Sequence, residues 1–343
     1  MKILLICTTR TWGGLEQTAY RDALELNKRA NKVHLLCTND GILHKKAVIA
    51  GVVCHTISNE SKYFNPQIFF KLSSIVREHG YEVVHFHSFN TILPCLTALF
   101  GKRCKVFATR HIYVEHSKKD LFHSFYLKRI DKMLAISEFS RRNILEMYPI
   151  SEDKIETLYL GIDLTKYERS DQKGVEFRRK FKIPVDANVV GVLGRIDPAK
   201  GQMEFVEAVP QILHQYPKAY FVITGHATSK DEQWYLSAVE KRIQELGLKE
   251  RVVLTGFIED VPAVLSAMDV LVMPSYFETF GLVVIEAFAC LVPVIATDMG
   301  SINEMISNNH SGIKIKPKSS QDIAEAVKTL LGSKELRDKI IIN

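Results

Sequence analysis

The sequence predicts an α/β protein built from two Rossmann-like, doubly wound domains that face each other across a cleft. Short apolar runs alternate with segments of helical period along both halves of the chain. Strands that alternate with helices indicate βαβ units and parallel sheets. The alternation is interrupted once, at about 164–188, where polar and charged residues dominate. At 343 residues the chain is long enough for two domains, and we expect them at 1–165 and 166–343.

The first half contains seven predicted strands, and each is a short apolar run bounded by polar or turn-forming residues. We expect these strands at 2–7, 33–37, 52–57, 82–86, 105–109, 132–136 and 154–160. The intervening segments carry apolar residues at helical spacing, which predicts helices at 14–30, 43–50, 69–79, 91–100, within 118–129, and at 137–147.

The alternation restarts in the second half. Strands are expected at 189–193, 219–224, 251–255, 269–273, 293–297 and 312–315. Helices are expected at 175–181, 202–214, 233–246, 261–267, from Gly281 onwards, and at 301–306, 320–331 and 333–340.

The composition, with 46% hydrophobic and 24% charged residues, is typical of a globular protein. No apolar run reaches the roughly 20 residues of a membrane span, and the N-terminal apolar run has no signal-peptide cleavage site after it. The six cysteines form no Cys-X-X-Cys pair, which favours buried thiols over disulfides or zinc ligands. We therefore expect a cytoplasmic protein.

The net charge of +6 comes from the first half of the chain, including a basic segment at 117–132. This segment could bind an anionic membrane surface, which would make the protein peripheral at the inner face of the cytoplasmic membrane. Its apolar residues Leu121, Phe122 and Phe125 also suit a core-facing helix. Of these two interpretations, the pattern favours the core-facing helix over the membrane-binding segment. No nucleic-acid-binding motif accompanies the charge, so we expect no nucleic-acid partner.

The stretch at 273–287 carries the strongest functional signal. A buried strand ends at Pro274, a loop follows, and a helix opens at Gly281. The free amides of such a helix start favour an anion at the carboxyl edge of a sheet. Glu278 and Glu286 lie on either side of this position. Because carboxylates would repel the anion itself, we expect them to accept hydrogen bonds from hydroxyl groups of the same ligand. A diphosphate with a polyol at each end, as in a nucleotide-sugar, satisfies both requirements.

Two cations follow the first strand of the second domain. Arg195 and Lys200 lie in the loop that enters the next helix, where both can meet an anion at the same sheet edge. The chain contains no Asp-X-Asp sequence to bind a diphosphate through a metal. His85 and His87 share one strand face, but no third ligand is evident. We therefore expect no metal site and no cofactor besides the donor.

Six elements in order resemble the retaining glycosyltransferases of family 4, which have the GT-B fold. They are Gly13-Gly14, Thr109-Arg110-His111, Leu160-Gly161-Ile162-Asp163, Gly194-Arg195 with Lys200, Thr255-Gly256-Phe257, and Glu278 with Glu286. One position departs from the family pattern, because Ile112 stands where relatives have an acid after the histidine.

The resemblance implies a donor site on the C-terminal domain. Glu286 would bind the ribose hydroxyls, and Glu278 the hydroxyls of the sugar. The diphosphate would be held by Arg195, Lys200 and the backbone at Phe280, Gly281 and Leu282. Phe257 and Ile258 would cradle the base, beside Gly225 in the pocket wall. From the N-terminal domain, Gly14 would approach the donor phosphate and His111 the transferring sugar. Glu278, His111, Arg195 and Lys200 are the expected catalytic residues.

The expected activity is transfer of a hexose-type sugar from a UDP-, GDP- or ADP-linked donor to a glycan or lipid-linked acceptor of the cell envelope. A nucleotide-sugar 2-epimerase of the same fold is one alternative, and a non-catalytic glycan-binding pseudoenzyme is another. The last helix of the family normally crosses back to the first domain. The chain ends at Asn343, so we expect that crossover helix to be absent or truncated.

Overall fold

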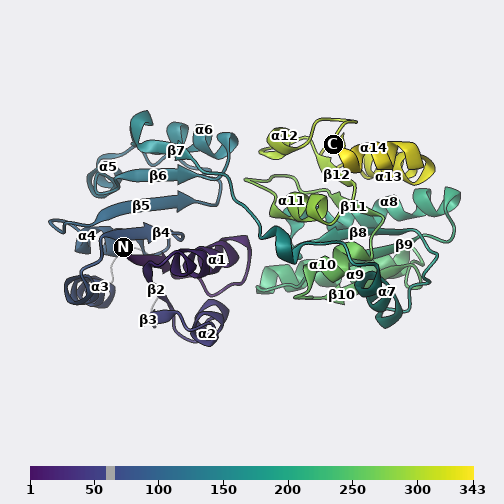
Figure 1. The fold of residues 1–343 in the computed structure, drawn as a ribbon. Helices are drawn as coiled ribbons and strands as arrows, with labels where there is room; N and C mark the ends of the chain where they lie inside the picture. Colours follow the sequence, from purple (N-terminus) through teal and green to yellow (C-terminus); the bar gives the residue numbers. More distant parts are fainter. Residues whose placement is uncertain (59–65) are drawn as a thin grey trace. The chain divides into compact units, whose positions relative to one another are not determined.

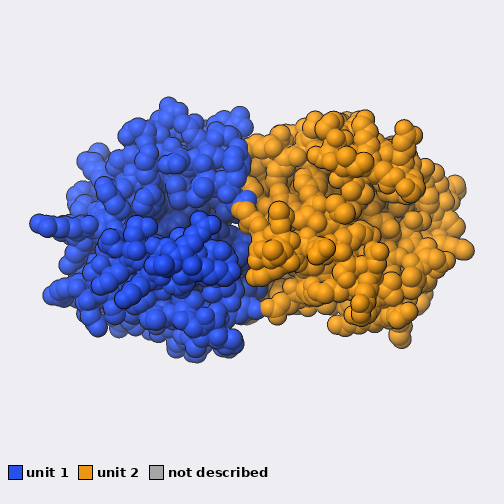
Figure 2. Space-filling model, in the orientation of Figure 1, with its two compact units in different colours: residues 1–160 blue, residues 161–343 orange. Residues whose placement is uncertain are grey.

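A computed structural model describes residues 1–58 and 66–343. The chain divides into two compact units, Met1–Leu160 and Gly161–Asn343 (Figure 2). Each unit is a parallel sheet with helices packed against it, so the predicted α/β class is confirmed.

Unit 1 contains a seven-stranded parallel sheet in the order β3-β2-β1-β4-β5-β6-β7 (Figure 1). Its strands are β1 (Lys2–Cys7), β2 (Lys32–Thr38), β3 (Val53–Ile57), β4 (Val83–Phe86), β5 (Lys105–Arg110), β6 (Lys132–Ala135) and β7 (Ile155–Thr157). Its helices are α1 (Gly14–Lys28), α2 (Ile42–Ile49), α3 (Pro66–His79), α4 (Ile92–Ala98), α5 (Leu121–Leu127) and α6 (Glu138–Met147). The strand order reverses at β1, which pairs with both β2 and β4.

Unit 2 repeats the design with a six-stranded parallel sheet in the order β10-β9-β8-β11-β12-β13. Its strands are β8 (Val189–Leu193), β9 (Tyr220–Thr224), β10 (Val252–Gly256), β11 (Val270–Met273), β12 (Val294–Thr297) and β13 (Ile313–Ile315). Its helices are α7 (Asp171–Lys180), α8 (Gln202–Gln215), α9 (Lys230–Glu245), α10 (Val261–Ser266), α11 (Leu282–Ala289), α12 (Ile302–Met305), α13 (Ser320–Gly332) and α14 (Lys334–Ile342). Here the order reverses between β8 and β11.

Both sheets are covered on both faces, which explains why their strands read as continuous apolar runs in the sequence. In unit 1, one apolar cluster packs under α3 and α4, and a second lies under α1 and α2. In unit 2, α8, α9 and α13 cover one face, while α7, α10 and α11 cover the other. All six cysteines are free thiols, and five of them are buried. No helix in the described ranges is long and apolar enough to cross a membrane.

The predicted boundaries differ most in three elements. The strand expected at 154–160 is only Ile155–Thr157. The helix expected at 175–181 begins four residues earlier, where Ser170 caps it, and it includes Gly174. A Cβ at Gly174 would collide with the carbonyl of Ser266, so only glycine allows this close packing. Because glycine is unfavourable inside helices, it obscured the helical pattern in the sequence. A capping box of Ser229 and Glu232 likewise starts α9 before the expected residue 233.

The favoured prediction of a core-facing helix at 118–129 is wrong for the residues on which it rested. Leu121 is 91% exposed, Phe125 63% and Phe122 52%. The helix α5 buries Tyr126 and Leu127 instead. The reason is the length of α5. Seven residues form fewer than two helical turns, which is shorter than the apolar face that the sequence pattern assumed.

Candidate functional site

The candidate donor site lies at the carboxyl ends of β8 and β11, the point where the strand order of unit 2 reverses. In open parallel sheets this is the position at which ligands bind. The loop after β8 contains the short 3₁₀ helix Pro198–Lys200, and the loop after β11 runs from Pro274 to Gly281. The amide of Tyr276 donates to the carbonyl of Ala199 at 2.8 Å, which ties these two loops together. The cations of one loop and the acid of the other are thereby brought to one place.

Lys200 and Glu278 form an ion pair at this edge. The Nζ of Lys200 donates to Oε1 of Glu278 at 2.5 Å, with side chains that are 28% and 13% exposed. The backbone of Glu278 is fixed as well, because its carbonyl accepts from the amide of Ser301 at 3.1 Å and from the Ser301 hydroxyl at 3.3 Å. Gly300 packs directly against that carbonyl with a φ of +62°, and a Cβ there would collide with it. The position of Glu278 therefore depends on a glycine 22 residues later in the chain.

Arg195 is held by two acids that the sequence analysis did not single out. It lies 3.1 Å from Oδ2 of Asp197 and 3.3 Å from Oε1 of Glu232. Burial would raise the pKa of Glu232, but hydrogen bonds from Thr228 and Ser229 and the charge of Arg195 outweigh it and hold the pKa below its ordinary value. Glu232 is therefore a charged carboxylate that orients the guanidinium. The capping-box pattern of Ser229 and Glu232 was the available sequence signal.

Glu286 lies one turn inside α11 and is only 6% exposed. Its Oε1 accepts a hydrogen bond of 2.7 Å from the hydroxyl of Tyr167. Tyr167 follows the 3₁₀ helix Leu164–Lys166 in the segment that the sequence assigns only as polar linker. The two residues are 119 positions apart, so no local pattern pointed to this contact.

The start of α11 matches the expectation from the sequence. Gly281 precedes the helix in a left-handed conformation, and Leu282 is its first residue. Phe280, just before this glycine, is 6% exposed. The first amides of the helix thus open at the same sheet edge as the ion pair of Lys200 and Glu278.

The residues expected at the base end of the pocket lie at the ends of β9 and β10. Phe257 is 49% exposed, and its ring lies edge-on to His226 at 5.0 Å between centroids. Ile258 is half-buried against the apolar cluster of unit 2. The amide of Gly225 donates to the carbonyl of Gly256 at 3.0 Å. A Cβ at Gly225 would strike the carbonyl of Gly194, so only glycine allows the ends of β9 and β8 to approach so closely.

In unit 1, His111 lies directly after β5 and is 8% exposed. Its Nε2 lies 3.3 Å from Nδ1 of His87, and Nε2 of His87 lies 3.5 Å from a carboxylate oxygen of Asp22. The ring of His85 is 4.3 Å from that of His87, which confirms that the two share one strand face. Burial lowers the pKa of His111 to about 3, with smaller contributions from His85 and nearby arginines. All three imidazoles are therefore neutral near pH 7.

Gly14 is the first residue of α1, and Gly13 is its cap. The carboxylate of Glu16 accepts from the amide of Gly13 at 2.7 Å and from the hydroxyl of Thr11 at 2.9 Å. The carbonyl of Gly14 accepts from the hydroxyl of Thr18 at 2.7 Å. The glycine pair is thus held as an ordered turn at the carboxyl end of β1. It belongs to the sheet edge of unit 1, as does His111.

Two family profiles match the chain and together cover nearly all of it. "Glycosyl transferases group 1" matches residues 175–343, and "Glycosyltransferase Family 4" matches residues 12–166.

Among curated proteins, the UDP-Gal:alpha-D-GlcNAc-diphosphoundecaprenol alpha-1,3-galactosyltransferase of Escherichia coli is 24% identical over 96% of this chain and 89% of its own. The alpha-D-kanosaminyltransferase of Streptomyces kanamyceticus is 27% identical over 63% of this chain and 55% of its own. The chain spans about half the length of the first curated relatives that it matches.

Two solved structures share the fold over the whole chain. HepE of Anabaena in complex with UDP-glucose has a TM-score of 0.85 at 22% identity, covering 100% of this chain and 93% of that one. A glycosyltransferase from Rickettsia africae has a TM-score of 0.88 at 22% identity, covering 99% and 91%. With both halves matched by their family profiles and the whole chain by these folds, the protein belongs to glycosyltransferase family 4 and has the GT-B fold.

Proposed function

We propose that this protein is a retaining, metal-independent glycosyltransferase that moves a hexose-type sugar from a nucleotide-diphospho-sugar to a glycan or lipid-linked acceptor. The donor is UDP-, GDP- or ADP-linked. The observation that carries the proposal is the charged cluster at the carboxyl edge of the unit 2 sheet. There, Lys200 and Glu278 are paired at 2.5 Å, next to the start of α11. Support for a nucleotide-sugar comes also from HepE, a protein of the same fold that was crystallised with UDP-glucose.

In the proposed complex the diphosphate is bound by positive groups of unit 2. Arg195 and Lys200 supply full charges, and the backbone at Phe280, Gly281 and Leu282 supplies partial ones at the helix start. Negative charge grows on the nucleotide as the bond to the sugar breaks, and these groups stabilise it. They do the work that a metal ion performs in other transferases.

Two acids bind the hydroxyls on either side of the diphosphate. Glu286 binds the ribose hydroxyls, and the hydrogen bond from Tyr167 helps to position its carboxylate. Glu278 binds hydroxyls of the sugar. To do so it gives up Lys200, which turns to the phosphate. Donor binding therefore exchanges one ion pair for another. Phe257 and Ile258 contact the base.

The reaction proposed for this site needs no separate general base. The acceptor attacks from the face on which the nucleotide departs, and the leaving phosphate oxygen takes the proton of the acceptor. His111 contacts the transferring sugar as a neutral imidazole, consistent with its lowered pKa. Gly14 approaches the donor phosphate with its backbone, where a side chain would interfere.

A lipid-linked acceptor is favoured by the surface of α5. Leu121, Phe122 and Phe125 are exposed, and the ring of Phe125 stacks on exposed Phe100 at 5.6 Å. The three residues of α5 belong to the basic segment 117–132. Exposed apolar residues in a basic segment suit the interface of an anionic membrane, at about 1 kcal/mol for each cation near the surface. The protein then works as a peripheral membrane enzyme.

Co-sedimentation with vesicles tests the membrane part of the proposal. We expect binding to vesicles that contain phosphatidylglycerol and little binding to vesicles of phosphatidylcholine alone. Phe125→Ser should weaken the binding, whereas Trp234→Ser, an exposed aromatic in unit 2 (72% exposed), should not. Equal binding by both variants would contradict docking through α5.

The decisive experiment for the activity measures release of free nucleotide from UDP-, GDP- and ADP-sugars, with and without a polyprenyl-diphosphate-linked sugar as acceptor. Acceptor-dependent release, with an α-linked product from an α-linked donor, supports a retaining transferase. Release without acceptor and with inversion at carbon 2 of the sugar would indicate the 2-epimerase. A protein that binds glycan but neither transfers nor hydrolyses any donor would be the pseudoenzyme.

Glu278→Ala separates sugar binding from nucleotide binding. We expect it to abolish transfer because the sugar loses its hydroxyl acceptor. Lys200→Ala should lower kcat more than donor affinity, since its main contact strengthens as charge leaves. Unchanged kcat in Lys200→Ala would reject that role.

A further inference from the structure

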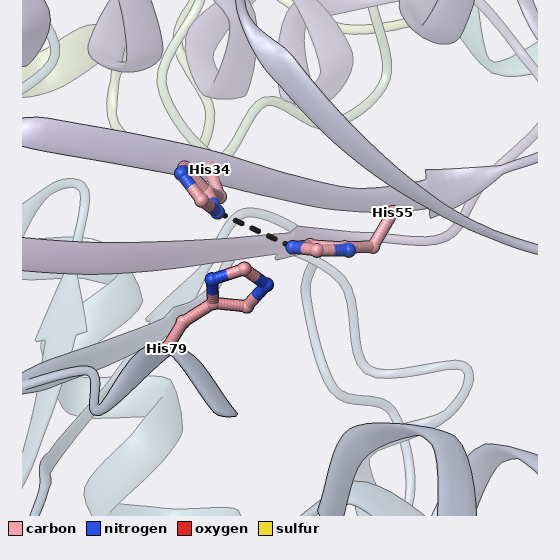
Figure 3. A group of neighbouring side chains, drawn as sticks. All are labelled: His34, His55 and His79. Carbon is pink, nitrogen blue, oxygen red and sulfur yellow. Dashed lines mark hydrogen bonds between the residues drawn. The ribbon is translucent and has the colours of Figure 1, made fainter. Parts of the chain in front are cut away.

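Three histidines converge near the amino edge of the unit 1 sheet, away from the carboxyl edge that carries Gly14 and His111. His34 lies near the amino end of β2, His55 lies on β3, and His79 is the last residue of α3. The ring of Tyr81, just before β4, lies 5.5 Å from that of His34 and 5.7 Å from that of His79 between centroids. Figure 3 shows the three imidazoles turned toward a common centre, although they come from elements far apart in the sequence. None of them belongs to the sheet edge at which donor or acceptor would bind.

The geometry of this cluster suits a metal ion. One ring nitrogen from each histidine lies within 4.8 Å of the others. The Nδ1 of His34 and the Nε2 of His55 are 3.3 Å apart. Two imidazole nitrogens on a tetrahedral zinc ion, each about 2.0–2.1 Å from it, are separated by about 3.3 Å. This pair thus has the spacing of two zinc ligands, and the ring of His79 lies 5.0 Å from that of His34 between centroids.

The nitrogens of this pair also point at one spot. The hydroxyl of Tyr81 lies 2.6 Å from Nδ1 of His34 and 3.0 Å from Nε2 of His55. Both nitrogens therefore direct a lone pair or a proton toward the same position between the rings. An ion bound by both lone pairs would displace that hydroxyl from between the rings, and a water molecule would complete its coordination.

Two nearby lysines act against the binding of a metal ion. Lys2 donates to the carbonyl of His79 at 2.9 Å, and Lys71 donates to the carbonyl of Thr56, next to His55. Neutral imidazole is the form that binds metal. A divalent ion held by nitrogen ligands gains far more from coordination than it loses to two lysines in contact with solvent.

We propose that His34, His55 and His79 form a binding site for a divalent transition metal of the zinc class, which joins β2 and β3 to the end of α3. Three neutral imidazoles are ligands that Zn²⁺ accepts readily. The site is structural, because it is at the amino edge of the sheet. It is separate from the metal-free transfer chemistry at the other edge.

The test uses the whole untagged chain after treatment with a chelator and removal of that chelator. Calorimetric titration with Zn²⁺ should give one ion per chain, and the bound ion should raise the melting temperature. Co²⁺ should bind the same site and report tetrahedral nitrogen ligands through its visible absorption.

Substitution locates the ion. His79→Gln is the main variant, since His79 is at a helix end and its loss disturbs the sheet least. We expect at least about tenfold weaker Zn²⁺ binding in His34→Gln, His55→Gln and His79→Gln. His214→Gln, an exposed histidine of unit 2, should bind as the wild type does.

Absence of Zn²⁺ binding by the wild type, or equal affinity in His79→Gln, would overturn the proposal. Circular dichroism of each metal-free variant separates loss of the ligand from loss of the fold. Sugar transfer is not needed for any of these readouts, so failure of the proposed activity leaves this test intact.

Discussion

The pair of Lys200 and Glu278 predicts that removing the acid tightens binding of a nucleoside diphosphate and abolishes sugar transfer. The two side chains are paired at 2.5 Å, yet in the proposed complex the ammonium contacts a phosphate. The ion pair must therefore open when nucleotide binds. Glu278→Gln preserves the shape of the side chain and removes this competition. A nucleoside diphosphate lacks the transferable sugar that Glu278 would bind, so it loses nothing from the substitution.

The expected gain follows from the burial of the pair. An exposed ion pair contributes about 0–1 kcal/mol, and breaking a fully buried one costs about 3–5 kcal/mol. Side chains that are 28% and 13% exposed place this pair between those limits, at about 1–2 kcal/mol. Since about 1.4 kcal/mol corresponds to a factor of ten, Glu278→Gln should bind the diphosphate about 5- to 30-fold more tightly.

Isothermal titration with the preferred nucleoside diphosphate measures the effect, and a transfer assay on the same samples measures the loss of activity. Glu250→Gln, an exposed acid in the same unit, is the matched control and should leave both unchanged. Binding that is unchanged or weaker in Glu278→Gln would refute the exchange of ion pairs. Retained transfer would show that Glu278 does not bind the sugar.

Three further predictions rest on separate features. Gly300→Ala should unfold at lower temperature than Gly247→Ala and lose transfer, because both have positive φ but only Gly300 packs against a backbone carbonyl; equal melting temperatures would contradict this. Tyr167→Phe should cost about 1 kcal/mol of stability, measured by urea unfolding, and raise the KM for donor, since the hydrogen bond to Glu286 is lost. In the folded chain the pKa of His111 is about 3, so between about pH 6.5 and pH 5 His111 takes up a proton only in the unfolded chain. The uptake at His111 should therefore lower stability by about 2 kcal/mol over that range, in addition to the losses from His85 and His87, and the total loss should be smaller in His111→Asn; equal losses would exclude this cause.

Most elements of the fold were predictable because their signals are local. The strands at 2–7 and 189–193 coincide with β1 and β8, since each is an unbroken apolar run. The ends of helices were harder to predict where a glycine or a capping box lies inside a polar stretch, as in α7 and α9. The solvent exposure of α5 was not predictable, because apolar residues at helical spacing look alike whether or not another element covers them.

The sequence by itself determined the chemical groups of the candidate site and the sheet edge to which they belong. Arg195, Lys200, Glu278 and Glu286 each follow or end a recognisable strand, and the carboxyl ends of parallel strands lie on one edge. Only the tertiary structure decided which of them meet. Val190 of β8 pairs with Val270 of β11, and this long-range register brings Lys200 to Glu278.

The contacts of Tyr167 with Glu286 and of His34 with His55 and His79 have the same origin. Periodicity reports which face of an element is buried, because burial is repeated every turn or every second residue. It carries no information about the partner of a single polar side chain. That partner is set by strand order and by packing between elements that are distant in sequence, and these exist only once the chain has folded.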